Sequence, residues 1–227
     1  MRIYHAAPGK LDDLNQRFRE HTVPLFEKHG MENIGYWTPL NNTNNLLIYM
    51  LAHASRDAAK KSFAAFGADP EWKAAQKASE ANGKLVTRLE SYFMQATDYS
   101  PAIKSSKTDP TRVFELREYT ASAGNLAALD ARFRDHTLGL FAKHGIQNVA
   151  YWHLMPDQKG ATNQLIYIIA HQSQDAGAAS FDTFRKDPNW VKAKDASEKK
   201  AGGSLTESGM AGVKSTYMRP TDYSPMR

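Results

Sequence analysis

The sequence contains no cysteine, which removes several classes of chemistry at once. Disulfide bonds, thiolate catalysis and cysteine-based metal sites are all excluded. The histidines show none of the HxH, HxxxH or HExxH spacings that bring two metal ligands together, and the chain has no GxSxG, P-loop or GxGxxG motif. The sequence therefore predicts no metal site and shows no sign of a bound cofactor.

Long apolar runs and a strong charge bias are also absent. The longest uncharged run, near Leu46–Ala54, is far shorter than the ~20 residues that a membrane-spanning helix needs. The net charge is only +5, and acids alternate with bases along segments such as Lys10–His29. This alternation indicates a solvated surface and not a nucleic-acid-binding stripe. We expect a soluble protein of unknown compartment. No signal peptide is visible, but a periplasmic bacterial protein whose targeting segment is absent from this sequence would also be compatible with the lack of cysteine.

What the sequence does contain is a long internal repeat. RFREHTVPLFEKHG begins at Arg17 and RFRDHTLGLFAKHG begins at Arg132, a spacing of 115 residues with ten of the fourteen positions identical. The spacing grows to 118 and then to 124, where TDYSP begins at Thr97 and again at Thr221. It changes within polar or glycine-rich segments, which are typical of surface loops that tolerate insertions. One module has been duplicated.

The repeat sets the expected domain limits. We expect a first module at 1–101, a linker at 102–111 and a second module at 112–227. The second module opens with RVFELREYT whereas the chain begins MRIYH, so that Arg2 aligns with Arg117. We therefore expect the first strand of module one to be truncated and the natural chain to start a few residues earlier.

Each module shows the same order of predicted elements. A short strand is followed by a helix, over about 11–29 in module one, that ends at Gly30, where glycine commonly closes a helix. Two strands come next, and a second helix is interrupted at Asp69-Pro70 because proline disfavours the helical conformation of the residue before it. With a last strand, the order is βαββαβ, which is the ferredoxin-like plait of the α+β class.

The expected sheet also predicts how the modules pack. A four-stranded sheet with helices on one face leaves its other face bare, and a tandem duplication supplies two such faces in one chain. We therefore expect the two ferredoxin-like modules to form an α/β-barrel pseudo-dimer.

The order of landmarks closely resembles a known family. The pattern ELREYT, RFRDHT, LFAKHG, NVAYW, LIYIIAH and then Asp-Pro-x-Trp is similar to the NIPSNAP domain of the dimeric α/β-barrel superfamily, and it covers almost the whole chain twice. The resemblance implies that fold. It implies little about activity, because the superfamily includes cofactor-free monooxygenases, haem-binding enzymes and binding proteins, and fold does not determine function. NIPSNAP proteins of eukaryotes are associated with mitochondria and with vesicle or mitophagy signalling.

His21 and His136 are the candidate catalytic residues. In the first helix, His21 falls between Phe18 and Leu25 on the apolar stripe that should face the sheet. An unpaired polar ring there costs roughly 1–3 kcal/mol, so it needs a partner. Two interpretations stay open: a core histidine bonded to a carbonyl or a tyrosine hydroxyl, or a pocket histidine that acts as acid and base. By superfamily analogy alone, either histidine is also a candidate axial ligand for haem.

The candidate ligand-binding residues lie on the inner strands and the first helix of each module. Tyrosine and tryptophan line apolar pockets while offering one polar handle, although they are more often core residues. Arginine on the helix is suited to an anion, although a solvated face or an ion pair between modules is the commoner role. The candidates are Tyr36, Trp37, Tyr49, His53 and Arg17 in module one, and Tyr151, Trp152, Tyr167, His171 and Arg132 in module two.

The function hypotheses follow from what is present and what is lacking. The first is a NIPSNAP-family binding or scaffold protein that holds a small apolar or aromatic ligand in a helix–sheet pocket. The alternative is a cofactor-free enzyme, monooxygenase-like or isomerase-like, with a pocket histidine as acid and base. Haem binding is the third. A homo-oligomer built from the intrachain pseudo-dimer is compatible with each, and one of the two pockets is expected to have diverged. His153 stands where module one has Thr38, and we expect it in a loop.

Overall fold

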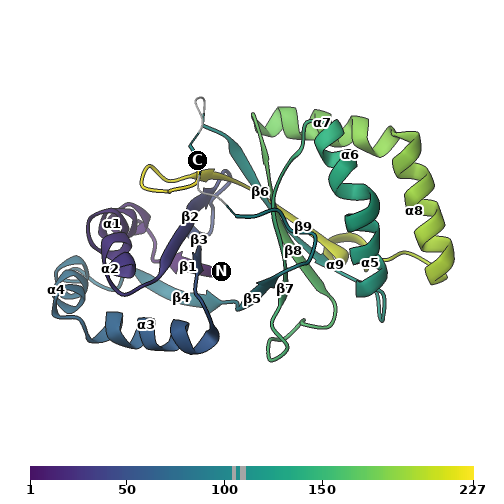
Figure 1. Ribbon diagram of the computed structural model, residues 1–227. Helices are drawn as coiled ribbons and strands as arrows, with labels where there is room; N and C mark the ends of the chain where they lie inside the picture. Colours follow the sequence, from purple (N-terminus) through teal and green to yellow (C-terminus); the bar gives the residue numbers. More distant parts are fainter. Residues whose placement is uncertain (104–105, 108–110) are drawn as a thin grey trace. The chain divides into compact units, whose positions relative to one another are not determined.

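The computed structural model describes residues 1–103, 106–107 and 111–227, and these form two compact units (Figure 1). Unit 1 consists of Met1–Ser91 and Arg219–Arg227, with the described part of 104–107. Unit 2 consists of Tyr92–Ile103 and the described part of 108–218. The predicted linker at 102–111 includes 104–105 and 108–110, which lie outside the described residues.

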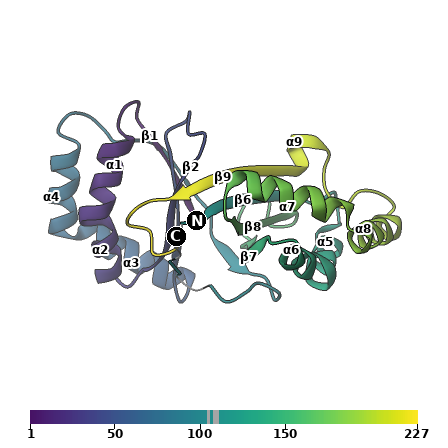
Figure 2. The same ribbon diagram turned by 90° about the horizontal axis from the view of Figure 1, so that it is seen from above.

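Unit 1 contains the elements of the first repeat. They are β1 (Arg2–Ala6), α1 (Leu11–Arg17), the π-helical turn η1 (Phe18–Thr22), α2 (Val23–Lys28), β2 (Glu32–Pro39), β3 (Leu46–Ala52), α3 (Arg56–Ala68), α4 (Pro70–Ser79) and β4 (Val86–Ser91). The strands lie in the order β4-β1-β3-β2, and each neighbouring pair is antiparallel. The four α-helices lie on one face of this sheet (Figures 1 and 2).

Unit 2 contains the elements of the second repeat and one added strand. They are β5 (Met94–Ala96), β6 (Val113–Thr120), α5 (Leu126–Arg132), η2 (Phe133–Thr137), α6 (Leu138–Lys143), β7 (Gln147–Leu154), β8 (Gln164–His171), α7 (Gln174–Lys186), α8 (Pro188–Ala201), α9 (Gly209–Gly212) and β9 (Val213–Pro220). The strand order is β9-β6-β8-β7-β5. The predicted α+β class and the ferredoxin-like βαββαβ order are confirmed in both repeats, while packing as an α/β barrel stays a prediction.

Aromatic side chains fill the layer between sheet and helices in each unit. Phe18 packs edge-on against Tyr36 and Tyr49, with ring centroids 5.8 and 5.3 Å away. Phe133 makes the same contacts with Tyr151 and Tyr167, at 5.8 and 5.3 Å. All six rings are at most 1% exposed. Because a fully buried large apolar side chain contributes about 1.5–3 kcal/mol, this layer is a main source of each unit's stability.

The first helix of each repeat is interrupted by one π-helical turn. In η1 the hydroxyl of Thr22 donates to the carbonyl of Arg17, at 3.3 Å, and in η2 Thr137 donates to Arg132, at 3.1 Å. Each hydroxyl thus bonds to a carbonyl five residues earlier. A π turn inserts one extra residue and so rotates everything after it around the helix axis. The side chains that face the sheet therefore depart from simple helical spacing.

The sequence TDYSP ends each repeat but packs in the unit built from the other repeat. We call Thr97–Pro101 and Thr221–Pro225 the exchanged segments. In unit 1 the amide of Thr221 donates to the carbonyl of Tyr36, at 2.9 Å, and the amide of Tyr36 donates to Ser224 Oγ, at 3.0 Å. In Figure 1 the end of the chain, in yellow, lies beside β2.

Unit 2 shows the matching contacts with the end of the first repeat. The amide of Thr97 donates to the carbonyl of Tyr151, at 3.0 Å, and the amide of Tyr151 donates to Ser100 Oγ, at 2.9 Å. Satisfying buried backbone groups in this way ties each exchanged segment to a central strand. Both exchanged segments are therefore ordered, and their packing is reciprocal.

A repeated acidic cap joins the two helices that meet at the Asp-Pro break. Asp69 caps α4 by accepting from the amide of Glu71 at 2.8 Å, and it also accepts from His29 Nε2 at 2.7 Å. Asp187 does the same with Asn189 and His144, each at 2.8 Å. His29 therefore has a structural role, because its ring bonds the aspartate that caps α4.

These caps predict that stability falls in acid. Hydrogen bonds from the neighbouring lysine, then from the histidine, hold the pKa of Asp69 and of Asp187 well below the usual value. A depressed folded-state pKa gives stability that is complete above the unfolded pKa of about 3.9 and is lost as the pH falls below it. We expect the Asp69→Asn/Asp187→Asn variant to take up about two fewer protons on unfolding below that pH. The slope of unfolding free energy against pH in urea titrations measures this uptake.

Candidate functional site

The candidate catalytic histidines do not face the sheet. His21 and His136 are exposed, and the side chain of His21 is 49% accessible, with Nε2 4.0 Å from Glu20. The predicted orientation is wrong because the π turn places Thr22 and Thr137 on the buried face instead. These exposed positions also do not fit an axial ligand of haem, which needs an apolar pocket around it. The catalytic role of the two histidines stays a prediction.

The two candidate arginines are buried in ion pairs. Arg17 Nη1 lies 3.1 Å from Glu80 Oε1, and its guanidinium lies over the ring of Trp72 at 5.1 Å. Arg132 repeats both contacts with Glu198, at 3.5 Å, and with Trp190, at 5.2 Å. Each arginine thus joins the first helix of its unit to the helix that follows the Asp-Pro break, α4 in unit 1 and α8 in unit 2, and its cation is already partnered.

The candidate aromatic residues form closed layers. Tyr36 and Tyr49 stack at 5.4 Å, and the hydroxyl of Tyr36 donates to Asn33. Tyr151 and Tyr167 stack at 5.0 Å. Trp37 follows Tyr36 and Trp152 follows Tyr151, and neighbouring residues of a strand point to opposite faces of the sheet. Each indole therefore lies on the face opposite to the tyrosine before it, and both indoles are buried. Their predicted contact with a ligand is not tested by this geometry.

His171 lies in a buried polar cluster, whereas its counterpart His53 is only partly buried. His171 Nε2 is 3.0 Å from Glu115 Oε2, and both side chains are 1% exposed. Glu115 also accepts from Arg117 and, at 2.5 Å, from Ser215 Oγ. We call Glu115, Arg117, His171 and Ser215 the Glu115 cluster. Burial pushes the pKa of Glu115 upward, but the hydrogen bond from His171 and the charge of Arg117 outweigh it, so this pKa lies below its usual value.

The helix above the Glu115 cluster is shaped to admit the histidine ring. A Cβ atom at Gly177 of α7 would lie 2.9 Å from Cγ of His171, closer than packing allows. The first repeat has Ala59 at the matching position, and there His53 is only partly buried. The His171 Nδ1 atom is buried and has no hydrogen-bond partner among the described residues. Sequence reasoning missed Glu115, although a glutamate on the helix-facing side of the strand VFELREYT was a usable signal.

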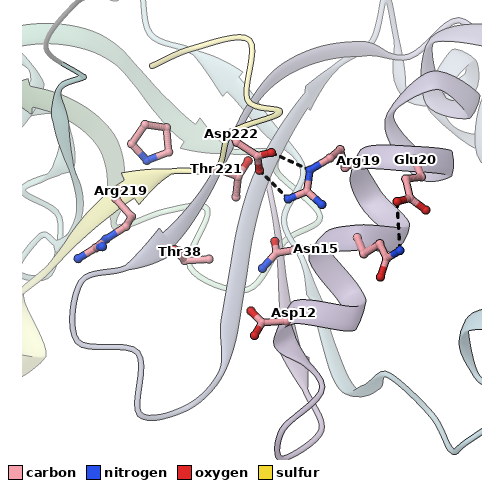
Figure 3. Close-up of a pocket in the computed structure, with 10 residues that line it drawn as sticks. Asp12, Asn15, Arg19, Glu20, Thr38, Arg219, Thr221 and Asp222 are labelled. Atoms are coloured by element: carbon pink, nitrogen blue, oxygen red, sulfur yellow. Dashed lines mark hydrogen bonds and ion pairs between the residues drawn. The ribbon is translucent and has the colours of Figure 1, made fainter.

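An open hollow of about 530 Å³ lies in unit 1, beside the exchanged segment (Figure 3). We call it the unit-1 hollow. Its walls come from α1 and η1, from the end of β2, and from the end of β9 with the residues that follow. The lining residues are Asp12, Asn15, Gln16, Arg19, Glu20, Thr38, Arg219, Pro220, Thr221 and Asp222. Every one except the proline carries a polar group.

Several lining groups are already held by each other. Arg19 makes two hydrogen bonds to the carboxylate of Asp222, at 2.7 and 2.8 Å (Figure 3). Gln16 donates to Glu20 at 3.1 Å. Asn15 Oδ1 accepts from the hydroxyl of Tyr223 at 2.7 Å. These bonds fix the walls and leave other groups free to meet a ligand.

Unit 2 is built differently at the same place. His153 aligns with Thr38 and lies in β7, so the loop prediction for it is wrong. Its Nε2 reaches Asp130 Oδ1 at 2.9 Å, and Asp130 aligns with Asn15. The hydroxyl of Tyr99 also bonds Asp130, at 2.6 Å. The imidazole therefore spans the space that the shorter Thr38 leaves open in unit 1. The differences between the aligned positions of the two repeats, Thr38 with His153 and Asn15 with Asp130, were the sequence signal for the hollow.

Among residues 1–103, 106–107 and 111–227, no three His, Asp or Glu side chains come together in a way that would hold a metal ion. No helix within these same ranges combines the length and apolarity required to cross a bilayer.

The antiparallel sheets and one-sided helices define a protein with two tandem ferredoxin-like modules, a class that includes the dimeric α/β-barrel folds. The chain belongs to the NIPSNAP family, whose sequence profile matches residues 1–101 and 114–225. The resemblance seen in the sequence is confirmed, and the biochemical role of this family is undefined among the solved relatives. No curated protein matches the chain.

Solved structures resemble this chain at low sequence identity. A NIPSNAP family protein of unknown function from Agrobacterium tumefaciens is 21% identical over 53% of this chain and 98% of its own, with a TM-score of 0.43. An anthrone oxidase-like protein is 11% identical over 97% of this chain and 89% of its own, with a TM-score of 0.59. A candidate monooxygenase from Lactobacillus acidophilus is 9% identical over 96% and 91%, with a TM-score of 0.57.

Proposed function

We propose that this protein binds a small polar molecule and that the unit-1 hollow is its binding site. The hollow itself carries this proposal. Its volume of about 530 Å³ falls in the range of ligand pockets, which is about 300–1,000 Å³. Polar side chains from three separate segments converge on it, which suits recognition of a hydrogen-bonding ligand more than of an apolar one.

The contrast between the repeats supports a dedicated site. Both repeats keep the aromatic layer, the π turn, the buried arginine and the exchanged segment. They differ at the hollow, where four lining positions, 12, 16, 38 and 219, carry side chains of another size or polarity than their counterparts in the second module. The aligned pairs are Asp12 and Ala127, Gln16 and Ala131, Thr38 and His153, and Arg219 and Gln95.

Filling the hollow should weaken binding. We expect the Thr38→His variant, which copies the second repeat, to lower the affinity for bound polar molecules at least about tenfold by occupying their space. A library of polar metabolite-sized compounds, followed through amide chemical shifts of α1 and β2, measures this loss. The matched His153→Thr variant alters unit 2 and should leave those shifts and affinities unchanged. A library without any compound that moves these amides, or equal binding by Thr38→His, would contradict the proposal.

A cofactor-free enzyme is the second candidate. The buried Glu115 cluster favours it, because a histidine paired with a carboxylate is a common acid–base arrangement. The whole-chain neighbours named for monooxygenase and anthrone oxidase chemistry support this only through their fold. An apolar ligand held by the tyrosines and tryptophans, and assembly into a homo-oligomer, stay predictions.

A further inference from the structure

We infer that each unit carries a binding site for the peptide sequence Thr-Asp-Tyr-Ser, and that this site accepts the sequence from a second copy of the chain. The inference is independent of what the unit-1 hollow binds, because its ligand is a polypeptide segment and its evidence is the packing of the exchanged segments. Each of the four residues makes a contact that occurs in both units.

Each exchanged segment forms a turn with its own fixed shape. The amide of Ser224 donates to the carbonyl of Thr221, at 3.1 Å, and Ser100 donates to Thr97 in the same way, at 3.2 Å. A bond from the fourth residue back to the first closes a β-turn. A segment whose shape is set by its own residues loses less conformational entropy when it binds.

A central strand of each unit holds both ends of the turn. Tyr36 accepts from the amide of Thr221 and donates to Ser224 Oγ, at 2.9 and 3.0 Å. Tyr151 holds the first and fourth residues of the other turn, at 3.0 and 2.9 Å. The threonine amide and the serine hydroxyl therefore fix the register of the segment on the strand.

The aspartate of the turn meets an arginine of the first helix. Asp222 accepts two hydrogen bonds from Arg19, at 2.7 and 2.8 Å (Figure 3). Asp98 accepts two from Arg134, at 2.9 and 2.7 Å. Two parallel bonds from one guanidinium select a carboxylate by its geometry as well as by its charge. Both pairs are exposed, so their charges can be changed without disturbing the core.

The tyrosine of the turn is recognised at its ring and at its hydroxyl. The Tyr223 ring lies 5.4 Å from that of Tyr36, and its hydroxyl donates to Asn15 at 2.7 Å. The other turn repeats both contacts, with the Tyr99 hydroxyl donating to Asp130 at 2.6 Å. A phenylalanine would lose the second contact, so the site is specific for tyrosine.

Each site recognises the sequence and not a local connection of the chain. The site of each unit takes its turn from the end of the other repeat. The two turns are also attached differently, since Thr97 follows the short strand β5 and Thr221 follows the longer β9. The contacts nevertheless coincide at all four residues. A second copy carries the same four residues twice, so its segments fit these sites equally well.

Two full-length variants test the inference by reversing one charge each. Arg19→Glu places a carboxylate against Asp222, and Asp222→Arg places a guanidinium against Arg19, so each chain repels its own segment. In a mixture of the two, each segment finds an opposite charge in the site of the other chain. Each restored pair contributes about fivefold, so the mixture should dimerise about 25-fold more strongly than either variant alone. Sedimentation equilibrium measures these constants, and the difference should shrink at high salt.

Matched controls separate this exchange from a general effect of charge. The double variant Arg19→Glu/Asp222→Arg restores the pair within one chain and should sediment like the wild type. A mixture of Arg185→Glu with Asp182→Arg alters an exposed pair within α7 and should not associate more than its components. A chain's own segment competes at an effective concentration in the mM range, so the proteins are mixed at about 0.1–1 mM. Unchanged far-UV circular dichroism verifies folding.

A peptide tests recognition of the sequence directly. The full-length Tyr223→Ala variant, whose own segment is weakened, is titrated with a peptide of residues 219–227. We expect shifts in the amides of α1, η1 and β2. The same peptide with alanine in place of its tyrosine should bind at least about tenfold more weakly, because it loses the ring contact and one hydrogen bond.

Two results would overturn the inference. A mixture of Arg19→Glu and Asp222→Arg that dimerises no more strongly than either variant alone would exclude a second copy as the source of the segment. Equal binding of the two peptides, or binding of neither, would show that the site does not recognise the sequence. The polar library tests the hollow separately, so neither result decides the proposed function.

Discussion

Replacing Glu115 by glutamine is expected to lower the free energy of unfolding by about 3–5 kcal/mol, the usual cost of breaking a buried ion pair from one side. Glutamine keeps the size of the side chain but removes its charge. Arg117, whose side chain is 13% exposed, would then lose its counter-ion in a buried setting. His171 would lose the carboxylate that now accepts from its ring.

Urea unfolding of the Glu115→Gln variant measures the loss, and hydrogen exchange locates it. Protection should fall in β6, β8, β9 and α7, the elements that contain or cover the cluster. The control is Arg185→Gln, which breaks an ion pair whose two side chains are 60% and 64% exposed and should cost below about 0.5 kcal/mol. A loss for Glu115→Gln as small as the control would mean that water already solvates Arg117.

Removing the tyrosine of each exchanged segment is expected to loosen the unit of the other repeat. Tyr223 lies against Phe18 and Tyr36, with ring centroids 6.4 and 5.4 Å away, and bonds Asn15. Because this ring is partly buried, Tyr223→Ala should cost about 2–3 kcal/mol, below the range for a fully buried aromatic. The affected amides should be those of α1, η1 and α2.

Tyr99→Ala is the matched variant for the first repeat. Tyr99 packs against Tyr151 at 5.7 Å and bonds Asp130, so its loss should reduce exchange protection in α5, η2 and α6. Mass spectrometry of exchanged peptides distinguishes the two helices in one experiment. If Tyr223→Ala instead exposed the amides of α5–α6, the exchanged segments would not pack as described.

Much of the fold could be predicted because its signals are local. Alternation of apolar and polar residues marks strands, Gly30 marks the end of a helix, and Asp69-Pro70 marks a break. The duplication strengthened each of these predictions, because two copies of one pattern at matched spacing do not arise by chance. The family resemblance then agreed with the element order.

The site could not be predicted as well, for two physical reasons. A single π turn inserts one residue, so His21 and His136 leave the sheet-facing stripe that ideal helical spacing assigned to them. The hollow depends on Arg219, which reaches unit 1 only because the end of the chain packs there. Spacing along the sequence contains no direct signal for such a distant contact. The difference between Thr38 and His153 was visible in the sequence. That the histidine closes the space could be seen only from the positions of Asn15 and Asp130 in the structure.

The reciprocal packing of TDYSP also constrains the order in which the protein is completed during synthesis. The aromatic layer and the sheet of unit 1 come from residues made early on the ribosome. The backbone groups of Tyr36, however, receive their partners only when Thr221 and Ser224 have been added. Unit 1 is thus completed only after the second repeat has been made, while Thr97–Pro101 is available before unit 2 is made. The first-made unit is the last to be finished.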